Sequence, residues 1–410
     1  MDLAEALSDH NDVTIYAEPT MDPMVCPVPV RPLDQSSLKE LQQCDRLVTV
    51  LGNSWLHGGA LKVARSSPSI VILHDVMLAG LFLSTVPRPE LEEVLTRYYG
   101  SAATSNALRS VDTGHSVWEG GEALRMPLFE AAIEKARGVV VHSQFAADLV
   151  RACTIAPVTV IPLAFRNPHS ADNEPSETPN SPYVLTLGHA NANKCHEMVM
   201  DALARLDMPE VRYVIAGSIT PDRRATLAKH AIQVGVTDQV VMTGQISDTH
   251  VAALVRRAAL CVNLRKPTFE SGSASLLEQM EAGKPVVVFD HGCYSDVPEE
   301  VAIKIPTDSD ADSLAAVLRA YLLDDPRLSS IGQRASAYVA ANHSFDLYAR
   351  QLTEFFDVVD AADPLTRLAA SVASLTSEWN MPTGSGLPLR WAESIGSILG
   401  MSSVSRFNEP

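Results

Sequence analysis

Short apolar runs alternate with amphipathic helical patterns over most of the chain, and this order limits the possible folds more than any other feature. A run that is apolar at every position is typical of a strand in a parallel sheet whose two faces are both covered by helices. Repetition of this strand and helix unit predicts an α/β protein with doubly wound, Rossmann-like domains. The expected strands are residues 13–18, 46–52, 69–75, 138–143 and 158–163, followed by 183–188, 213–218, 240–244, 260–265, 285–290 and 301–306.

A polar segment at 166–182 interrupts this alternation. It holds four prolines and several charged residues and lacks large aliphatic side chains, which is typical of a linker. The 410-residue length also suits two domains of roughly 150 to 200 residues each. We expect an N-terminal domain at 1–165, a linker at 166–182, a C-terminal domain at 183–345 and C-terminal helices at 346–410, including helices at 365–379 and 389–399.

The N-terminal domain begins in an unusual way. A helical pattern at 2–8 leads directly into the run at 13–18, whereas a doubly wound domain usually begins with its central strand. A missing N-terminal segment would explain this start, and a naturally shortened domain is the alternative. Without the central strand, we expect the runs 13–18 and 46–52 either to flank a vacancy or to close up directly on the run at 69–75 with a distorted register.

The charge balance argues against two classes of partner. The sequence has 49 Asp and Glu against 32 Lys and Arg, a formal net charge of −17, so most of its surface should repel nucleic acid and anionic lipid. We therefore expect no nucleic-acid partner. The longest apolar stretch, 70–86, is interrupted by His74 and Asp75 and falls short of the roughly 20 apolar residues of a spanning helix, so we expect no stable membrane insertion.

The N-terminus and the cysteines point to the cytoplasm. The first residues, MDLAEALSDHNDV, have no basic start, apolar core or cleavage site, so they resemble neither a signal nor a transit peptide. The 6 cysteines are scattered without a C-x-x-C pair, which disfavours a zinc site and a disulfide framework. A cytoplasmic location with reduced thiols is therefore expected.

The most informative stretch for function is 264–290, LRKPTFESGSASLLEQMEAGKPVVVFD. It predicts a strand that ends near Arg265, a small polar loop, and a helix that begins near Ser273 and ends at Gly283. The unpaired N–H groups of that helix start would form an anion site, where the dipole and the donors contribute on the order of 0.5 to 2 kcal/mol. Three small residues would let a diphosphate come close to these donors. They are Ser271, Gly272 and Ser273.

Two carboxylates flank this anion site. Glu270 precedes the helix and Glu278 lies inside it, and as negative groups they should meet hydroxyls of a sugar or ribose, not phosphate. The alternative is that Ser271 and Ser273 merely cap the helix and that both glutamates are solvated. Spacing alone does not decide between the two interpretations.

Basic residues at strand ends could neutralise a diphosphate. In a metal-free site such a group needs about two positive partners, and Lys194 and Arg265 are the basic residues at nearby strand ends. A surface lysine at a helix start is the alternative for Lys194. The D-x-D sequence within 308–312 is attributed to helix capping and not to metal binding, because it stands between a strand and a helix.

Polar residues also follow strands in the N-terminal half. His74 closes the run at 69–75, at the edge where α/β sheets bind ligands, and can hydrogen-bond a sugar hydroxyl or the charge that develops at an anomeric carbon. Asp75, on the acceptor side, is expected to cap the following helix. Asn53 and His57 follow another strand and either line the same cleft or form a capped turn.

Two further segments complete the N-terminal half. His142 and Ser143 follow a third strand, and Ser143 is expected to be the N-cap of the next helix. The segment 100–123 is polar and rich in small residues, with Trp118 near its end. It is interpreted as a mobile lid or as a simple loop.

The spacing of Glu270 and Glu278 reproduces the Glu-x7-Glu motif of retaining glycosyltransferases of family 4, which have the GT-B fold. LLEQMEAGKPVVV, which includes Glu278, resembles the LEAMAxGxPVV continuation of that motif. GHANANKCHEMVMDAL, residues 188–203, resembles the turn in which the family holds the donor diphosphate with a lysine. GNSWLH, ILHD and VVVHSQFAADLV extend the likeness loosely into the N-terminal half, where they look like a subgroup acting in polysaccharide or glycolipid assembly. The resemblance implies two Rossmann-like domains that face a cleft.

This resemblance also implies a role for each matching residue. Lys194 would contact the diphosphate, Glu278 the ribose and Glu270 the donor sugar. His189 stands where many members have Arg, so Arg265 would supply the second positive group. The implied residues are Glu270, Lys194 and His74 as catalytic groups, Glu278, His189, Arg265, Ser271, Gly272, Ser273, Gly188 and Ile246 as donor contacts, and Asn53, His57 and Asp75 on the acceptor side.

The implied activity is transfer of a sugar from a nucleotide-diphosphate donor to a saccharide or lipid-linked acceptor with retention of configuration. Fixed positive groups would stabilise the departing diphosphate, so no metal and no other cofactor is expected. A GT-B phosphorylase, in which inorganic phosphate replaces the nucleotide, is one alternative. A non-catalytic sugar-nucleotide-binding or scaffold protein is the other, and the missing first strand favours it.

Overall fold

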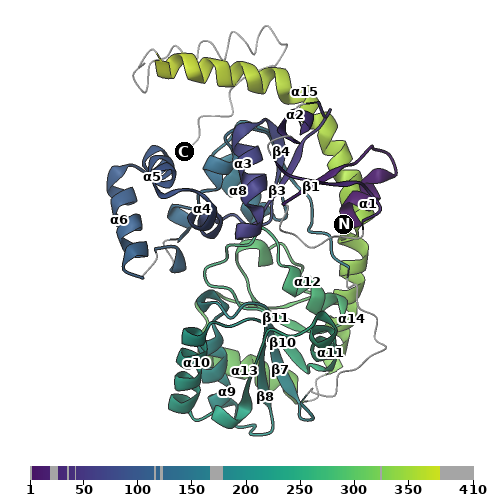
Figure 1. Cartoon of the computed structure of the whole chain (residues 1–410). Coiled ribbons are helices and arrows are strands. Elements are labelled where there is room, and N and C mark those ends of the chain that lie inside the picture. The colour runs from purple at the N-terminus through teal and green to yellow at the C-terminus, as the bar shows by residue number, and fades with distance from the viewer. Residues whose placement is uncertain are drawn as a thin grey trace, which may run out of the picture.

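The computed structural model describes residues 2–18, 26–34, 37–41, 43–114, 117–120, 123–166, 179–323 and 326–378. Two α/β domains lie one above the other in Figure 1, and helix α15 (Phe345–Glu378) returns from the lower, C-terminal domain to the upper, N-terminal one. Parallel sheets form the centre of both domains, which confirms the α/β prediction. Most of the expected linker and the helix expected at 389–399 lie outside the described residues.

The C-terminal sheet has six parallel strands in the order β12–β11–β10–β7–β8–β9. β7 and β10 are neighbours although β8 and β9 separate them in the chain, so the strand order reverses between them. Ligands of doubly wound sheets bind outside the carboxyl ends of such a pair. The strands are β7 (Tyr183–Leu187), β8 (Arg212–Ala216), β9 (Val240–Gly244), β10 (Leu260–Val262), β11 (Val286–Phe289) and β12 (Ile303–Ile305).

Helices cover both faces of this sheet. Val184 and Tyr213 point into an apolar cluster with α9, α10 and α13, and the adjacent Leu185 and Val214 point into a second cluster with α11, α12 and α14. Burial on both faces explains why the strand runs are apolar at every position. The bounds are α9 (His196–Leu206), α10 (Pro221–Val234), α11 (Asp248–Arg257), α12 (Ala274–Glu281), α13 (Ala311–Leu322) and α14 (Pro326–Asn342), with short turns η4 (Ala192–Lys194), η5 (Thr237–Gln239) and η6 (Gly292–Tyr294).

The main N-terminal sheet has four parallel strands in the order β3–β4–β5–β6. The largest apolar cluster of this domain packs one face of the sheet, including Leu51, Val71 and Val139, against helices of the same domain. The elements are β3 (Val48–Leu51), η1 (Trp55–His57), α3 (Gly58–Ser66), β4 (Ser69–Leu73), α4 (Ala79–Thr85), α5 (Arg88–Tyr99), α6 (Ser101–Asp112), η2 (Val117–Glu119), η3 (Ala123–Arg125), α7 (Phe129–Ile133), β5 (Ala136–Val141), α8 (Gln144–Arg151) and β6 (Val158–Val160).

The opposite face of this sheet is covered by α15 and α1 (Asp2–Ser8). Ile72 and Val140 share an apolar cluster with Leu352 and other residues of α15. Gly138 allows the close approach, because a Cβ at this position would lie 2.5 Å from a methyl carbon of Val359. The helix expected at 365–379 is not separate, since α15 continues through it to Glu378.

The start of the chain forms a small sheet of its own. β1 (Ile15–Ala17) pairs in parallel with β2 (Val30–Pro32), and α2 (Ser37–Leu41) follows. β3, from the run at 46–52, pairs directly with β4 as one alternative expected, but its register is not distorted. The run at 13–18 does not join this pair, since β1 lies in the separate sheet with β2. Within the described part of the chain, β1 and β3 are not paired with each other. β2 escapes prediction from sequence because its three residues are exposed and include a proline.

The segment 100–123 is neither a lid nor a simple loop. Most of it is helix α6, which packs against α5 through buried residues that include Thr104 and Ala107. Trp118 is 4% exposed, and its Nε1 donates to Met126 O at 2.7 Å. The lid interpretation is wrong because the small residues form a helix contact. By contrast, capping by the D-x-D segment is confirmed: Asp310 accepts from Ser313 N at the start of α13.

Candidate functional site

Two loops meet at the carboxyl ends of β7 and β10. Lys266 N donates to Asn193 O at 2.7 Å, and Asn193 Nδ2 donates to Pro267 O at 3.2 Å. One loop ends with Lys194, and the other runs from Arg265 to the start of α12. The two sets of candidate donor residues are therefore brought together at the point where the strand order reverses.

Helix α12 begins and ends where the sequence predicts. Ser273 is its N-cap and accepts from Leu276 N at 3.4 Å. After Ala282, Gly283 takes a left-handed conformation with φ of 71°. The helix start lies at the carboxyl edge of the sheet because α12 follows β10, so its first amides face the ligand-binding side.

Lys194 lies inside the protein beside the end of β7. It is 7% exposed, and its Nζ donates to Leu187 O at 2.5 Å. Gly188 leaves space for this amine, because a Cβ at Gly188 would lie 2.6 Å from Lys194 Nζ. Burial, with a smaller contribution from Arg265, lowers the pKa of Lys194 well below its usual value. An anion bound here would favour the charged form of the amine.

Arg265 has a partner that the sequence did not reveal. Its Nε donates to Glu270 Oε1 at 2.9 Å, and its side chain is 3% exposed against 23% for Glu270. Its Nη1 donates to Leu264 O, and its Nη2 donates to Ser275 Oγ. Arg265 therefore holds Glu270 at the rim of the site, and a role as second cation for a diphosphate stays a prediction.

Ser271 joins the two domains. Its Oγ accepts from His142 N at 2.7 Å, and its N–H donates to His74 O at 2.9 Å. It is fully buried, and its N–H and Oγ both take part in these contacts between the domains, so its proposed role next to a diphosphate remains a prediction. The next residue, Gly272, packs closely against His142, because a Cβ at this position would lie 2.9 Å from His142 Cβ.

Two histidines stand at the ends of neighbouring N-terminal strands. His74 follows β4, His142 follows β5, and His74 Nδ1 lies 2.9 Å from His142 Nε2. Next to His142, Ser143 Oγ accepts from Ala146 N, which confirms Ser143 as the N-cap of α8. The pairing of His74 with His142 was missed, although both histidines directly follow β-branched runs.

The acceptor-side candidates make hydrogen bonds within their own domain. Asp75 Oδ2 accepts from Asn53 N at 2.7 Å, and Asn53 Oδ1 accepts from Leu81 N in α4 at 3.1 Å. The expectation that Asp75 caps α4 is therefore wrong. Asn53 instead accepts the hydrogen bond at the start of that helix. His57 Nδ1 contacts Val50 O at 3.0 Å. Burial is the main cause that raises the pKa of Asp75 to about 7, and Glu270 adds to it.

The remaining donor candidates lie on other parts of the C-terminal domain. His189 is exposed and its Nδ1 contacts Ser218 Oγ at 2.6 Å. Ile246 packs against the apolar cluster under α11 and α12. Glu278 is half-buried within α12. Their proposed contacts with a base, a ribose or a phosphate remain predictions.

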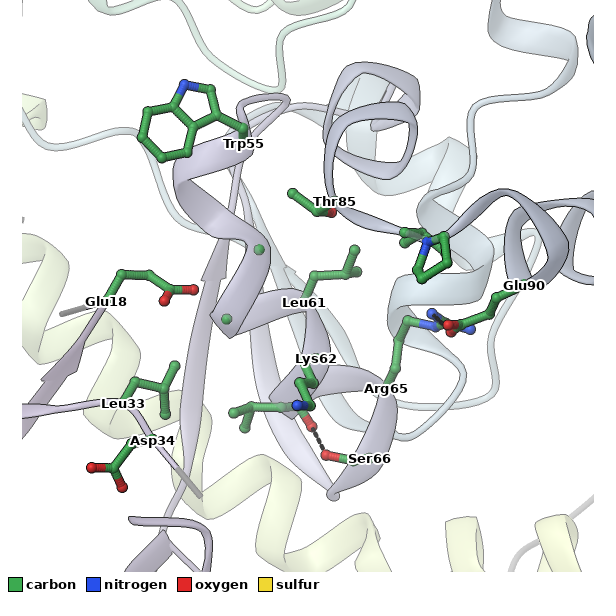
Figure 2. Close-up of a pocket in the computed structure, with 15 residues that line it drawn as sticks. Glu18, Leu33, Asp34, Trp55, Leu61, Lys62, Arg65, Ser66, Thr85 and Glu90 are labelled. Carbon is green, nitrogen blue, oxygen red and sulfur yellow. Dashed lines mark hydrogen bonds and ion pairs between the residues drawn. The ribbon is translucent and has the colours of Figure 1, made fainter. Parts of the chain in front are cut away.

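A cavity of about 990 Å³ lies elsewhere in the N-terminal domain. Figure 2 shows Glu18 and Leu33, from the ends of β1 and β2, facing helix α3 across it. Gly58 and Gly59 at the start of α3 line the cavity. This glycine pair is the sequence feature that could have indicated the cavity. None of the predicted site residues lines this cavity, so we place the candidate site at the strand ends.

Two kinds of feature are absent from the described residues, a metal-binding cluster and a membrane-spanning helix. No group of three His, Cys, Asp or Glu side chains among them is arranged to hold a metal ion. No helix within the described ranges combines the length and the apolar character needed to cross a membrane.

The C-terminal half matches a known family model. Residues 170–338 match the family described as Glycosyl transferases group 1. No curated protein sequence matches the chain.

Similar solved structures cover most of the chain. A sucrose-phosphate synthase from Thermosynechococcus elongatus has a TM-score of 0.57 and 19% identity, covering 88% of this chain and 92% of that chain. Anabaena HepE, in complex with UDP and glucose, has a TM-score of 0.55 and 17% identity, covering 81% and 86%. WaaG, a glycosyltransferase involved in lipopolysaccharide biosynthesis, has a TM-score of 0.55 and 16% identity, covering 86% and 93%. These likenesses confirm the predicted GT-B fold.

Proposed function

We propose that this protein is a retaining glycosyltransferase that moves a sugar from a nucleotide-diphosphate donor to a saccharide or lipid-linked acceptor. The observation that carries the proposal is the meeting of Lys194, the Arg265–Glu270 pair and the start of α12 within the part of the chain that matches the group 1 family. A diphosphate is held by positive charge and N–H donors, whereas sugar hydroxyls suit carboxylates. Both kinds of group lie at this one sheet edge.

In the proposed reaction, charge develops on the diphosphate as its bond to the anomeric carbon breaks. Lys194 and the first amides of α12 stabilise that charge from fixed positions. The charged form of Lys194 is disfavoured by burial in the free protein, so a bound diphosphate supplies the missing counter-charge. Glu270 orients the sugar, Glu278 binds the ribose, and the acceptor attacks from the side on which the diphosphate leaves.

Binding is tested with a thermal-shift panel of UDP, GDP, ADP and their sugars on the full chain. UDP-glucose comes first, because Anabaena HepE is also known in complex with it. A nucleotide at 100 times its dissociation constant should stabilise the protein by about 2.7 kcal/mol. Absence of stabilisation by every nucleotide and nucleotide sugar would contradict a nucleotide-sugar donor site.

Turnover separates the proposal from its alternatives. With an accepted donor, the anomeric proton coupling of the product, read by NMR, should match that of the donor sugar. Inversion of that configuration would contradict a retaining mechanism. A phosphorylase would release sugar phosphate from a glycan with inorganic phosphate and ignore the nucleoside. A binding protein would bind the nucleotide sugar without any transfer to an acceptor.

A further inference from the structure

The histidine pair of the N-terminal domain extends to a third group. His74 Nδ1 lies 2.9 Å from His142 Nε2, and His142 Nδ1 lies 2.9 Å from Ile161 O. The two rings are stacked, with centroids 5.0 Å apart. The chain of contacts therefore ends at a main-chain carbonyl, which can only accept a hydrogen bond.

That carbonyl determines where each proton lies. His142 is 8% exposed and burial lowers its pKa to about 3, so its ring is neutral and carries one N–H. This N–H must be on Nδ1, because Ile161 O has no hydrogen to give. His142 Nε2 is then an acceptor, and the contact with His74 requires a hydrogen on His74 Nδ1.

The outer nitrogen of His74 is left with a lone pair. Burial and the nearby His57 lower the pKa of His74 to about 4, so this ring is neutral as well. With its single hydrogen on Nδ1, Nε2 can only accept. His74 is partly exposed, and among the described residues Nε2 has no hydrogen-bond partner.

Main-chain contacts hold the same two histidines against the candidate donor loop. Ser271 N donates to His74 O at 2.9 Å, and His142 N donates to Ser271 Oγ at 2.7 Å. Val76 N also donates to Phe269 O at 2.9 Å. The main chain at His74 therefore lies beside the loop that contains Glu270, at the junction of the two domains.

We propose that His142 is a positioning residue that keeps His74 in the Nδ1–H tautomer and so presents a bare acceptor nitrogen to the ligand. Such a nitrogen receives a hydrogen bond from a hydroxyl and disfavours a phosphate or carboxylate. The identity of that hydroxyl, one on the transferred sugar, rests on the proposed function. The tautomer itself does not depend on it.

The tautomer is measured by long-range ¹H–¹⁵N NMR on the full chain with ¹⁵N-labelled histidine. His74→Gln identifies the His74 signals. We expect wild-type His74 to carry its hydrogen on Nδ1 and a bare nitrogen at Nε2. A hydrogen on His74 Nε2, or a mixture of both tautomers, would overturn the proposal.

Two substitutions of His142 separate positioning from packing. His142→Phe keeps a ring but removes the acceptor, and we expect His74 to lose its single tautomer and kcat to fall about tenfold with the donor KM nearly unchanged. His142→Gln retains an acceptor oxygen near the Nε2 position and should recover most of the rate. Equal losses in both variants, or an unchanged His74 tautomer in His142→Phe, would contradict the proposal.

His343→Phe is the matched control. His343 Nδ1 contacts Leu163 O at 2.7 Å, so this variant also removes a buried contact between an imidazole and a carbonyl, but one that does not involve His74. It should leave the His74 tautomer unchanged. If no nucleotide sugar is turned over by the wild type, the proposed function fails, while the NMR measurement still decides the tautomer.

Discussion

Polar residues follow the strands of both sheets, but the two sheets use them differently. At the C-terminal sheet, loops after β7 and β10 are tied together and bring Lys194 and Glu270 to one edge. At the N-terminal sheet, Asn53, Asp75 and His57 are bound to neighbouring groups of their own domain. His74 and His57 each keep one ring nitrogen without a hydrogen-bond partner among the described residues.

The difference follows from topology. The C-terminal sheet reverses its strand order between β7 and β10, and the helices that follow these two strands pack on opposite faces, which is the arrangement at which doubly wound sheets bind ligands. The N-terminal sheet has four strands, and its neighbouring small sheet of β1 and β2 is separate from it. Polar side chains at the N-terminal edge therefore mostly form hydrogen bonds with nearby main-chain groups. Contacts with a ligand depend on the few polar atoms that are not used in this way.

The strongest test of this comparison is Lys194→Ala. Removing one charged stabiliser of the leaving group should lower kcat/KM by at least about a hundredfold, since such losses amount to roughly 2.7 to 4 kcal/mol. Lys266→Ala is the control, because this lysine lies in the adjoining loop, is exposed, and donates to Thr307 O. A near-normal rate in Lys194→Ala would mean that His189 or Arg265 stabilises the diphosphate.

Asp75→Asn tests the buried carboxyl of the N-terminal edge. The folded-state pKa of Asp75 is raised from 3.8 to about 7, so from pH 4 to 7 the folded protein holds a proton that the unfolded chain has lost. This group therefore makes the wild type less stable as the pH rises through that window. Asparagine can still accept from Asn53 N but does not titrate.

The free energy of unfolding of Asp75→Asn, relative to the wild type, should rise by on the order of 2 kcal/mol between pH 4 and 7 and then level off, with allowance for partial exposure. Urea unfolding at several pH values measures it. Asp45→Asn, at an exposed aspartate, is the control. A difference that stays constant with pH would show that Asp75 ionises normally.

Glu278→Ala and Glu270→Gln test whether Glu278 binds the ribose and Glu270 orients the sugar, as proposed for the C-terminal edge. Glu278→Ala should weaken nucleotide binding about tenfold by loss of a charged hydrogen bond to the ribose. Glu270→Gln keeps an oxygen for Arg265 but loses the charge, and should lower kcat more than it raises the nucleotide Kd. Calorimetry and steady-state kinetics separate the two effects. Unchanged nucleotide affinity in Glu278→Ala would remove the ribose assignment.

Asn53→Ala should have the smallest effect of these substitutions. It tests whether Asn53 at the N-terminal edge stabilises the fold and does not bind a ligand. Loss of the contact with Leu81 N should reduce stability by about 1 kcal/mol, which is typical of a lost helix cap. The melting temperature reports it, and the nucleotide Kd should be unchanged. A large loss of acceptor affinity with no loss of stability would assign Asn53 to the acceptor site instead.

Local signals predicted the C-terminal domain more fully than the N-terminal one. The start of α12 at Ser273 and its end at Gly283 were both foreseen, because capping depends on a few adjacent residues. The ion pair of Arg265 with Glu270 was not, since it depends on how the loop between them folds. Likewise the segment that contains α6 was interpreted as a lid or a simple loop, because its small residues indicate a helix only when α5 is placed against them.

The sequence by itself determined the order of strands and helices, the division into two doubly wound domains, and the helix start next to Glu270. These features follow from apolar periodicity and turn chemistry, which act over a few residues. Only the tertiary structure decided that Ser271 joins the domains, that Asp75 binds Asn53, and that His74 meets His142. Each of these contacts joins residues far apart in the chain, so its geometry exists only after the sheets have packed.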